Sequence, residues 1–470
     1  MQCRSVSMLI ALVMFVTACA APAAPSPTTA PAAAPTTAPT AAAAPTVAPT
    51  AAAKPTTAAA PTTAAATAVA VIAPTGAAGT TTPATAPTAA PAAAATTAPA
   101  AAAPAAGAKT VRIGVPANIT GELSSIEGEA SRGSQLAVKE INAAGGINGM
   151  MIEPFYADTK SDITTATTVV TQMIESNKVD ALVGMTDTSF MLATGPVAQK
   201  AGVPFMDIGG TAPVITSLGD YIFMLPFGDN TQAAATAEFT YAKKGWKNAA
   251  MLMDTEWDYT KFLSKYFIAR YTEQGGNMLL EDTYKSGDKD FSAQFTKIKN
   301  LQPPPEFVFV SAVPDDIGTI VKQARDQGVT LPIVGGDGYD TPLLVEVAGP
   351  DKSANVFFST HLGVYGDDPT AAKFRDAFNK EYGQEPQSVF AALGYDGINL
   401  VADAIKRAGS TDHKAIRDAL AATKGWKGSS GEITYPPGER IPSKSVALIE
   451  VKSGKFNLLD VVVPNKIPEP

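Results

Sequence analysis

A stretch made almost wholly of alanine, proline and threonine divides this chain. Residues 20–108 hold 16 of the 37 prolines and a single charged side chain, Lys54. Prolines at this density interrupt an alanine-rich helix before it can propagate, and the stretch has too few large apolar side chains to build a core. The sequence therefore predicts a disordered, partly polyproline-II tether, and it confines the folded body to residues 109–470.

The folded body is large and acidic. Its 362 residues carry 34 Lys+Arg and 44 Asp+Glu, a net charge of −10. A single hydrophobic core stops growing at about 250–300 residues, so a body of this length predicts two lobes. Since the acidic balance comes without a basic stripe, nucleic acid is excluded as a partner.

The first 18 residues have the pattern of a signal peptide. Arg4 precedes an apolar run over residues 8–16, which is shorter than the ~20 residues that a membrane-spanning helix needs. The run ends in Val16-Thr-Ala-Cys19, which resembles a bacterial lipobox, in which the cysteine is acylated and becomes the new N-terminus. The alternative is an ordinary secretory signal with a chance cysteine. We predict an extracytoplasmic protein, lipid-anchored through Cys19 to the bacterial cell membrane, at the cell surface or in the periplasm.

The body contains no cysteine, since the two in the chain are Cys3 and Cys19. Disulfides, thiolate nucleophiles and cysteine metal sites are therefore excluded from it. Phosphate-loop, dinucleotide-binding, zinc-protease and nucleophile-elbow motifs are missing, and His361 and His413 are the only imidazoles. We expect neither an enzyme, nor a cofactor, nor a bound metal.

Strand and helix patterns alternate along the body. Apolar runs over 110–116, 151–157, 179–184 and 203–207 are separated by helical patterns, and the alternation restarts with runs over 248–253, 278–282, 306–310 and 331–334. Strands spaced in this way specify parallel sheets covered by helices on both faces. The fold class predicted is α/β, with two lobes.

Three loops rich in Gly, Ser and Thr follow strands of the first lobe, over 120–125, 185–189 and 208–213. In open α/β sheets, ligands bind at the carboxyl ends of the strands. Hydroxyls and free backbone N–H groups at helix starts suit a carboxylate or another anionic group. The same side chains also serve as ordinary helix caps, and that alternative stays open.

One long run carries a family resemblance. Residues 136–149 read Leu-Ala-Val-Lys-Glu-Ile-Asn-Ala-Ala-Gly-Gly-Ile-Asn-Gly, and 210–213 read Gly-Thr-Ala-Pro. With Lys289-Asp-Phe-Ser and the segment 431–438, these runs resemble the branched-chain amino acid binding proteins of ABC transporters. The resemblance implies a type I periplasmic-binding fold, whose two Rossmann-like lobes have parallel sheets, are joined by three crossovers and close on the ligand like a hinge. It places lobe 1 at 109–227 and 359–431, and lobe 2 at 228–358 and 432–470.

The resemblance also implies a ligand site. The first lobe would hold a carboxylate through Thr188, Ser189, Gly209, Gly210 and Thr211, and Asp337 of the second lobe would pair with an ammonium group. Ser125 stands near the place of a cleft tyrosine, and Trp257 is either an aromatic lid or the start of a packed helix. A family disulfide matches Lys160 and Asp187, which suggests an ion pair in its place.

The function implied is that of a monomeric solute-binding lipoprotein. It would capture an amino acid or a similar small polar ligand by hinge closure and deliver it to an ABC permease and its ATPase. The alternative is a ligand-sensing receptor domain with the same fold and no link to transport. The sequence departs from the family pattern around the cleft, for example at Ser125 and Trp257. The identity of the ligand therefore stays open among branched-chain and other amino acids, urea, amides and aromatic acids.

Overall fold

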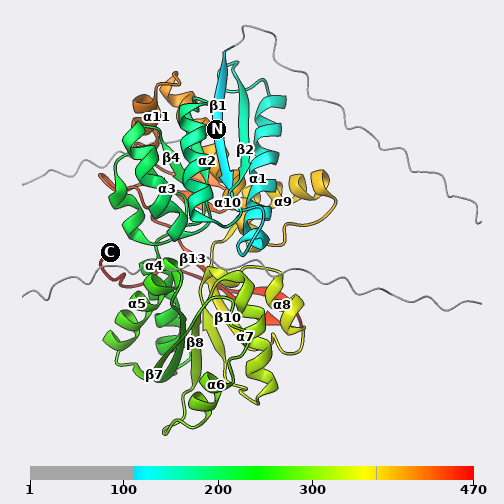
Figure 1. The fold of residues 1–470 in the computed structure, drawn as a ribbon, viewed down its shortest axis with the longest axis vertical. Helices are drawn as coiled ribbons and strands as arrows, with labels where there is room; N and C mark the ends of the chain where they lie inside the picture. The colour runs from blue at the N-terminus through cyan, green and yellow to red at the C-terminus, as the bar shows by residue number, and fades with distance from the viewer. Residues whose placement is uncertain (1–108, 367) are drawn as a thin grey trace, which may run out of the picture. The chain divides into compact units, whose positions relative to one another are not determined.

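A computed structural model describes residues 109–366 and 368–470 (Figure 1). The predictions for the signal peptide, Cys19 and the tether fall on residues 1–108 and lie outside the described residues. None of the described helices is long and apolar enough to cross a membrane.

The first sheet has five parallel strands in the order β2-β1-β3-β4-β5. They are β1 (Thr110–Ala117), β2 (Met151–Asp158), β3 (Ala181–Gly184), β4 (Phe205–Asp207) and β5 (Ile222–Met224). The helices that go with it are α1 (Ser124–Ala143), α2 (Ile163–Glu175), α3 (Thr188–Ala201), α9 (Pro369–Tyr382), α10 (Phe390–Ala408) and α11 (His413–Ala421). We call this sheet with its helices the first lobe.

The second sheet has seven strands in the order β14-β13-β10-β9-β8-β6-β7. They are β6 (Asn248–Asp254), β7 (Asn277–Tyr284), β8 (Phe307–Ser311), β9 (Ile333–Gly335), β10 (Val356–Thr360), β13 (Val446–Lys452) and β14 (Lys455–Val462). The last two join antiparallel, and the others are parallel. Its helices are α4 (Asp229–Glu238), α5 (Asp258–Glu273), α6 (Ser292–Lys299), α7 (Pro314–Asp326) and α8 (Leu343–Ala348). This sheet and its helices form the second lobe.

The chain passes between the sheets three times: after β5, after β10, and after the short hairpin of β11 (Trp426–Gly428) and β12 (Gly431–Ile433). The α/β class with parallel-dominated sheets and three crossovers is thus as predicted. The residue limits assigned to each lobe stay a prediction.

Strand β8 illustrates why both faces of the second sheet are covered. Phe307 and Phe309 belong to one buried cluster, while Val308 and Val310 belong to the other. Successive side chains of a strand point to opposite faces, so a continuous apolar run fits only a sheet with helices on both sides.

Helix α1 begins at Ser124, inside the segment 120–125 that the sequence predicts as a loop. Glycines at 128 and 133 lower helix propensity and obscured this start. Gly133 is needed because α1 and α10 cross there: an added Cβ would lie 1.9 Å from the Ala391 carbonyl oxygen. At the same crossing, the Ser134 hydroxyl donates to the Gly394 carbonyl oxygen (3.1 Å).

Candidate functional site

Loops from both lobes meet around a cavity of about 20 Å³. Its walls include Thr186, Asp187, Thr188 and Gly209 of the first lobe, and Tyr259, Val313, Asp337 and Gly338 of the second, with Leu123, Ile126, Pro314 and Phe390 completing them. A volume of this size holds about one water molecule. The lobes must therefore separate to admit an organic ligand.

Larger hollows lie elsewhere, and one of about 460 Å³ is lined by Asn230, Lys444 and the C-terminal prolines. It includes none of the loops that follow the strands of the first sheet. We therefore place the candidate site in the smaller cavity, where the carboxyl ends of strands from both sheets converge.

The predicted first-lobe residues surround the start of α3. Thr188 and Gly209 line the cavity, whereas Ser189, Gly210 and Thr211 lie behind it. The Thr188 hydroxyl accepts from Ala212 N–H (3.2 Å). The Thr211 hydroxyl is buried and lies beside the carboxyl group of Asp229.

The two glycine N–H groups are already engaged. Gly209 and Gly210 donate to Oδ1 of Asp207, at 3.1 and 2.7 Å. Asp207 is fully buried, and burial raises the pKa of its carboxyl well above the usual value. These N–H groups stabilise the loop in this closed arrangement, so they do not face the cavity as free donors.

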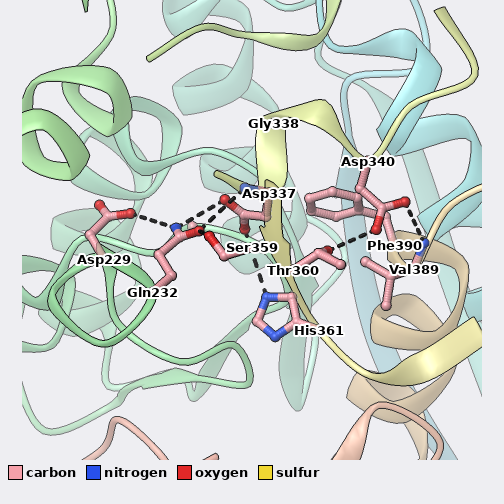
Figure 2. Close-up of polar contacts among 12 residues, drawn as sticks. Asp229, Gln232, Asp337, Gly338, Asp340, Ser359, Thr360, His361, Val389 and Phe390 are labelled. Atoms are coloured by element: carbon pink, nitrogen blue, oxygen red, sulfur yellow. Dashed lines mark hydrogen bonds and ion pairs between the residues drawn. The ribbon is translucent and has the colours of Figure 1, made fainter. Parts of the chain in front are cut away.

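Asp337 lies on the second-lobe wall, directly after β9, and is 2% exposed. Figure 2 shows how Gln232 holds it: Nε2 of Gln232 donates to Oδ1 of Asp337 (3.0 Å) and to Oδ1 of Asp229 (2.9 Å). The Gln232 Oε1 accepts from Asp337 N–H (3.2 Å) and from the Ser359 hydroxyl (3.2 Å). The Asp337 carboxylate is thus fixed in position at the wall of the cavity.

His361 lies behind Asp337, at the second crossover (Figure 2). Its Nε2 is 3.7 Å from Oδ2 of Asp337, beyond hydrogen-bond distance, and its ring stacks on Phe227 at 3.8 Å between centroids. Burial lowers the pKa of His361 to about 4, so the imidazole is neutral at neutral pH. The ring packs the hinge, and neither of its nitrogens has a hydrogen-bond partner among residues 109–366 and 368–470.

Lys444 ties the third crossover to the first. It is half-buried, and its Nζ donates to the Leu225 carbonyl oxygen (3.3 Å) and the Ser430 hydroxyl (3.1 Å). Burial lowers its pKa to about 8. Phe227, at the first crossover, stacks on His361, at the second. The segments at all three crossovers are therefore linked at one hinge.

Several contacts join the lobes around the cavity, among them Val389 N–H donating to Oδ1 of Asp340 (3.1 Å). The Thr341 hydroxyl donates to the Ser125 hydroxyl (3.0 Å), and Asp258 N–H donates to the Ser189 hydroxyl (3.1 Å). Trp257 stacks on Phe190 with ring centroids 6.1 Å apart. Ser125, Ser189 and Trp257 therefore join the lobes in the closed arrangement and do not line the cavity.

Sequence reasoning missed Glu127, Asp229, Gln232 and Tyr259. Glu127 and Asp229 are fully buried and without a salt bridge to Lys or Arg in the described part of the chain, which local sequence does not reveal. The signal for Tyr259 was present, because it lies two residues after Trp257, in the first turn of α5. The suggested ion pair between Lys160 and Asp187 is wrong: Lys160 is exposed, and Asp187 instead caps α3 by accepting from Ser189 N–H (2.6 Å).

Two α/β lobes joined by three crossovers, with loops of both lobes around one cavity, define a bilobed solute-binding protein. The model of the periplasmic binding protein family matches residues 110–455, and the chain belongs to that family. The family is one of non-catalytic solute-binding proteins, so the prediction that the protein is not an enzyme is confirmed.

Solved structures and curated relatives agree that this chain is similar to the amino acid binding proteins of the family. The substrate-binding protein of a branched-chain amino acid transporter from Streptococcus pneumoniae, solved with isoleucine, is 34% identical and has a TM-score of 0.71, over 76% of this chain and all of that chain. A leucine-binding protein from Thermotoga maritima is 32% identical with the same TM-score, over 76% of this chain and 99% of its own. A leucine-, isoleucine-, valine-, threonine- and alanine-binding protein from Pseudomonas aeruginosa is 26% identical over 316 residues, 67% of this chain and 83% of that protein. The resemblance predicted from the sequence is confirmed.

Proposed function

We propose that the protein captures an amino acid, or a similar small polar molecule, by closing its two lobes, and delivers it to an ABC permease and its ATPase. The observation that carries this proposal is the placement of Asp337 opposite Thr188 across one cavity. A buried carboxylate and a hydroxyl at a helix start are complementary to an ammonium and a carboxylate group. The isoleucine complex of the S. pneumoniae relative supports an α-amino acid as the ligand.

Closure follows from the contacts between the lobes. Ser125 with Thr341, Ser189 with Asp258, and Phe190 with Trp257 form only when the lobes meet. A ligand that bridges the lobes adds its own contacts to these and shifts the population toward the closed form.

We expect the right ligand to stabilise the protein measurably. A ligand at 100 times its dissociation constant adds about 2.7 kcal/mol to the free energy of unfolding. A thermal-shift panel of amino acids, urea, amides and aromatic acids, read by differential scanning fluorimetry, tests this. An upward shift with at least one amino acid or close analogue is expected. A panel in which only an aromatic acid or nothing raises Tm contradicts the proposal.

We also propose that Cys19 is acylated and that residues 20–108 tether the body to the membrane. Cys19→Ser is expected to abolish incorporation of labelled palmitate and to move the protein from the membrane to the soluble fraction of bacteria expressing the full chain. Two or more acyl chains are needed for stable anchoring, so loss of the thiol removes the anchor. Cys3→Ser is the matched control and should leave both readouts unchanged. Membrane retention of Cys19→Ser would contradict lipid attachment at this residue.

A further inference from the structure

Asp340 is a fully buried carboxylate next to the candidate site. It lies three residues after Asp337, in the loop between β9 and α8, and it does not line the cavity. Figure 2 shows that Oδ2 of Asp340 accepts from the Thr360 hydroxyl (2.7 Å) and that Oδ1 accepts from Val389 N–H (3.1 Å). The Tyr365 hydroxyl donates to the same Oδ1 (2.9 Å). These three donors offset the cost of burying the carboxylate.

The groups that hold Asp340 come from both lobes. Thr360 is the last residue of β10 in the second lobe, and Tyr365 follows it at the second crossover. Val389 directly precedes α10 of the first lobe, and the hydroxyl of the neighbouring Ser388 donates to the Asp340 carbonyl oxygen (2.6 Å). Two hydrogen bonds therefore join Asp340 to the first lobe, and separation of the lobes breaks both.

Helix α10 receives its cap from the other lobe. The helix is 19 residues long, and Val389, at its N-cap position, has no side-chain oxygen to offer. The first N–H groups of a helix lack partners within the helix, and they carry a partial positive charge. The Asp340 carboxylate supplies both an acceptor and a negative charge at this end. The closed arrangement thus completes α10, and an open arrangement leaves its start without this cap.

The contact between Asp340 and α10 connects two walls of the cavity. Gly338, two residues before Asp340, lines the cavity from the second lobe, and Phe390, the first residue of α10, lines it from the first. The next residue of the loop, Thr341, donates to the Ser125 hydroxyl of α1 (3.0 Å). The loop is therefore fastened to the first lobe directly beside the ligand site, by groups that do not line it.

We propose that Asp340 is a positioning residue for ligand capture, which caps α10 across the closed lobes and thereby sets how long the ligand is held. The inference rests on the proposed function, since it assigns the closure of the same cleft to one residue. A ligand enters while the lobes are apart and this contact is absent, whereas release requires the contact to break. Asp340 therefore acts on the dissociation rate and not on the association rate.

Stopped-flow tryptophan fluorescence of the full-length chain in detergent tests this inference, because Trp257 stacks on Phe190 across the lobes and reports their closure. The probe is L-isoleucine or, where another amino acid of the thermal-shift panel raises Tm more, that amino acid. Asp340→Asn should raise the dissociation rate constant at least tenfold and change the association rate constant less than threefold. Hydrogen–deuterium exchange gives a second readout: the bound amino acid should protect residues 387–391 in the unmodified protein, and less so in the variant.

Ser388→Ala reaches the same contact from the first lobe and serves where Asp340→Asn does not fold. It removes one donor, so we expect the dissociation rate constant to rise at least threefold. Asp316→Asn is the matched control, because Asp316 is a buried carboxylate whose hydrogen bonds, from the Ser286 hydroxyl and Gly287 N–H, stay within the second lobe. Its dissociation rate constant should be unchanged, whatever the change in Tm.

Two negative outcomes are distinguishable. A lowered Tm with an unchanged dissociation rate constant in the Asp340 and Ser388 variants, or an equal fall in the association rate constant, would show a purely structural role. Either result overturns the inference and leaves the proposed function standing. Binding of no amino acid by the unmodified protein would sink the proposed function, and the inference with it.

Discussion

Asp337→Asn is expected to weaken ligand binding by about 100-fold or more. Removing one partner of a buried, hydrogen-bonded charge pair costs about 2–5 kcal/mol, and each 1.4 kcal/mol is a factor of ten in affinity. Asparagine still offers an oxygen to Gln232, so the loop geometry is kept while the charge is lost. Isothermal titration with the ligand identified in the thermal-shift panel measures the loss.

The stability of Asp337→Asn should not fall. The Asp337 charge contributes, after burial, to raising the pKa of the neighbouring Asp229, so the two carboxyls oppose each other in the folded protein. Asp351→Asn, at an exposed position of the same lobe, is the matched control and should leave affinity unchanged. An Asp337→Asn protein with unaltered affinity would show that the ammonium group binds elsewhere.

Gly133→Ala is expected to destabilise the protein by about 3 kcal/mol, because overpacking of a tight contact typically costs 1–3 kcal/mol and occasionally more. The added Cβ would lie 1.9 Å from the Ala391 carbonyl oxygen and 2.9 Å from the Tyr395 nitrogen. Both are backbone atoms of α10, so relief requires the two helices to move apart. Chemical denaturation followed by far-UV circular dichroism measures the change.

Gly128→Ala is the matched control, since it makes the same substitution one and a half turns earlier in α1. An added Cβ at Gly128 has nothing within 4 Å. Alanine has a helix propensity about 1 kcal/mol more favourable than glycine, so this variant should be neutral or stabilised. Equal destabilisation of both variants would show that helix propensity, not the crossing with α10, decides the outcome.

The fold could be predicted because the patterns that indicate strands and helices lie within short segments of the sequence. Apolar runs of strand length separated by helical patterns specify covered parallel sheets, and the loops with Thr188, Gly209 and Thr211 had to follow strands of the first sheet. The Asp337 position came from the family resemblance, since a Gly-Gly-Asp-Gly loop on its own reads as an ordinary turn.

The side chains that become buried where distant segments pack together could not be predicted from the sequence. Glu127 looks like a surface residue in the sequence, and only the packing of α1 beside the loop after β3 makes it a buried group. Trp257 could be read as a lid or as a helix start; it precedes α5 and stacks on Phe190 without lining the cavity, and the lid remains a prediction. His361 gave no sign of its place in the hinge, because its contacts Phe227 and Asp337 come from other parts of the chain.

The crossing of α1 with α10 has a consequence for the order in which the protein folds. Ser134 and Gly394 are 260 residues apart, and the whole second sheet up to β10 lies between them. Contacts of such long range form slowly, because the chain loses the entropy of closing a long loop before the contact stabilises the fold. During synthesis, α1 lacks its partner until nearly all of the chain has been made. The N-terminal lobe therefore completes late, which suits a chain whose first 18 residues predict export before folding.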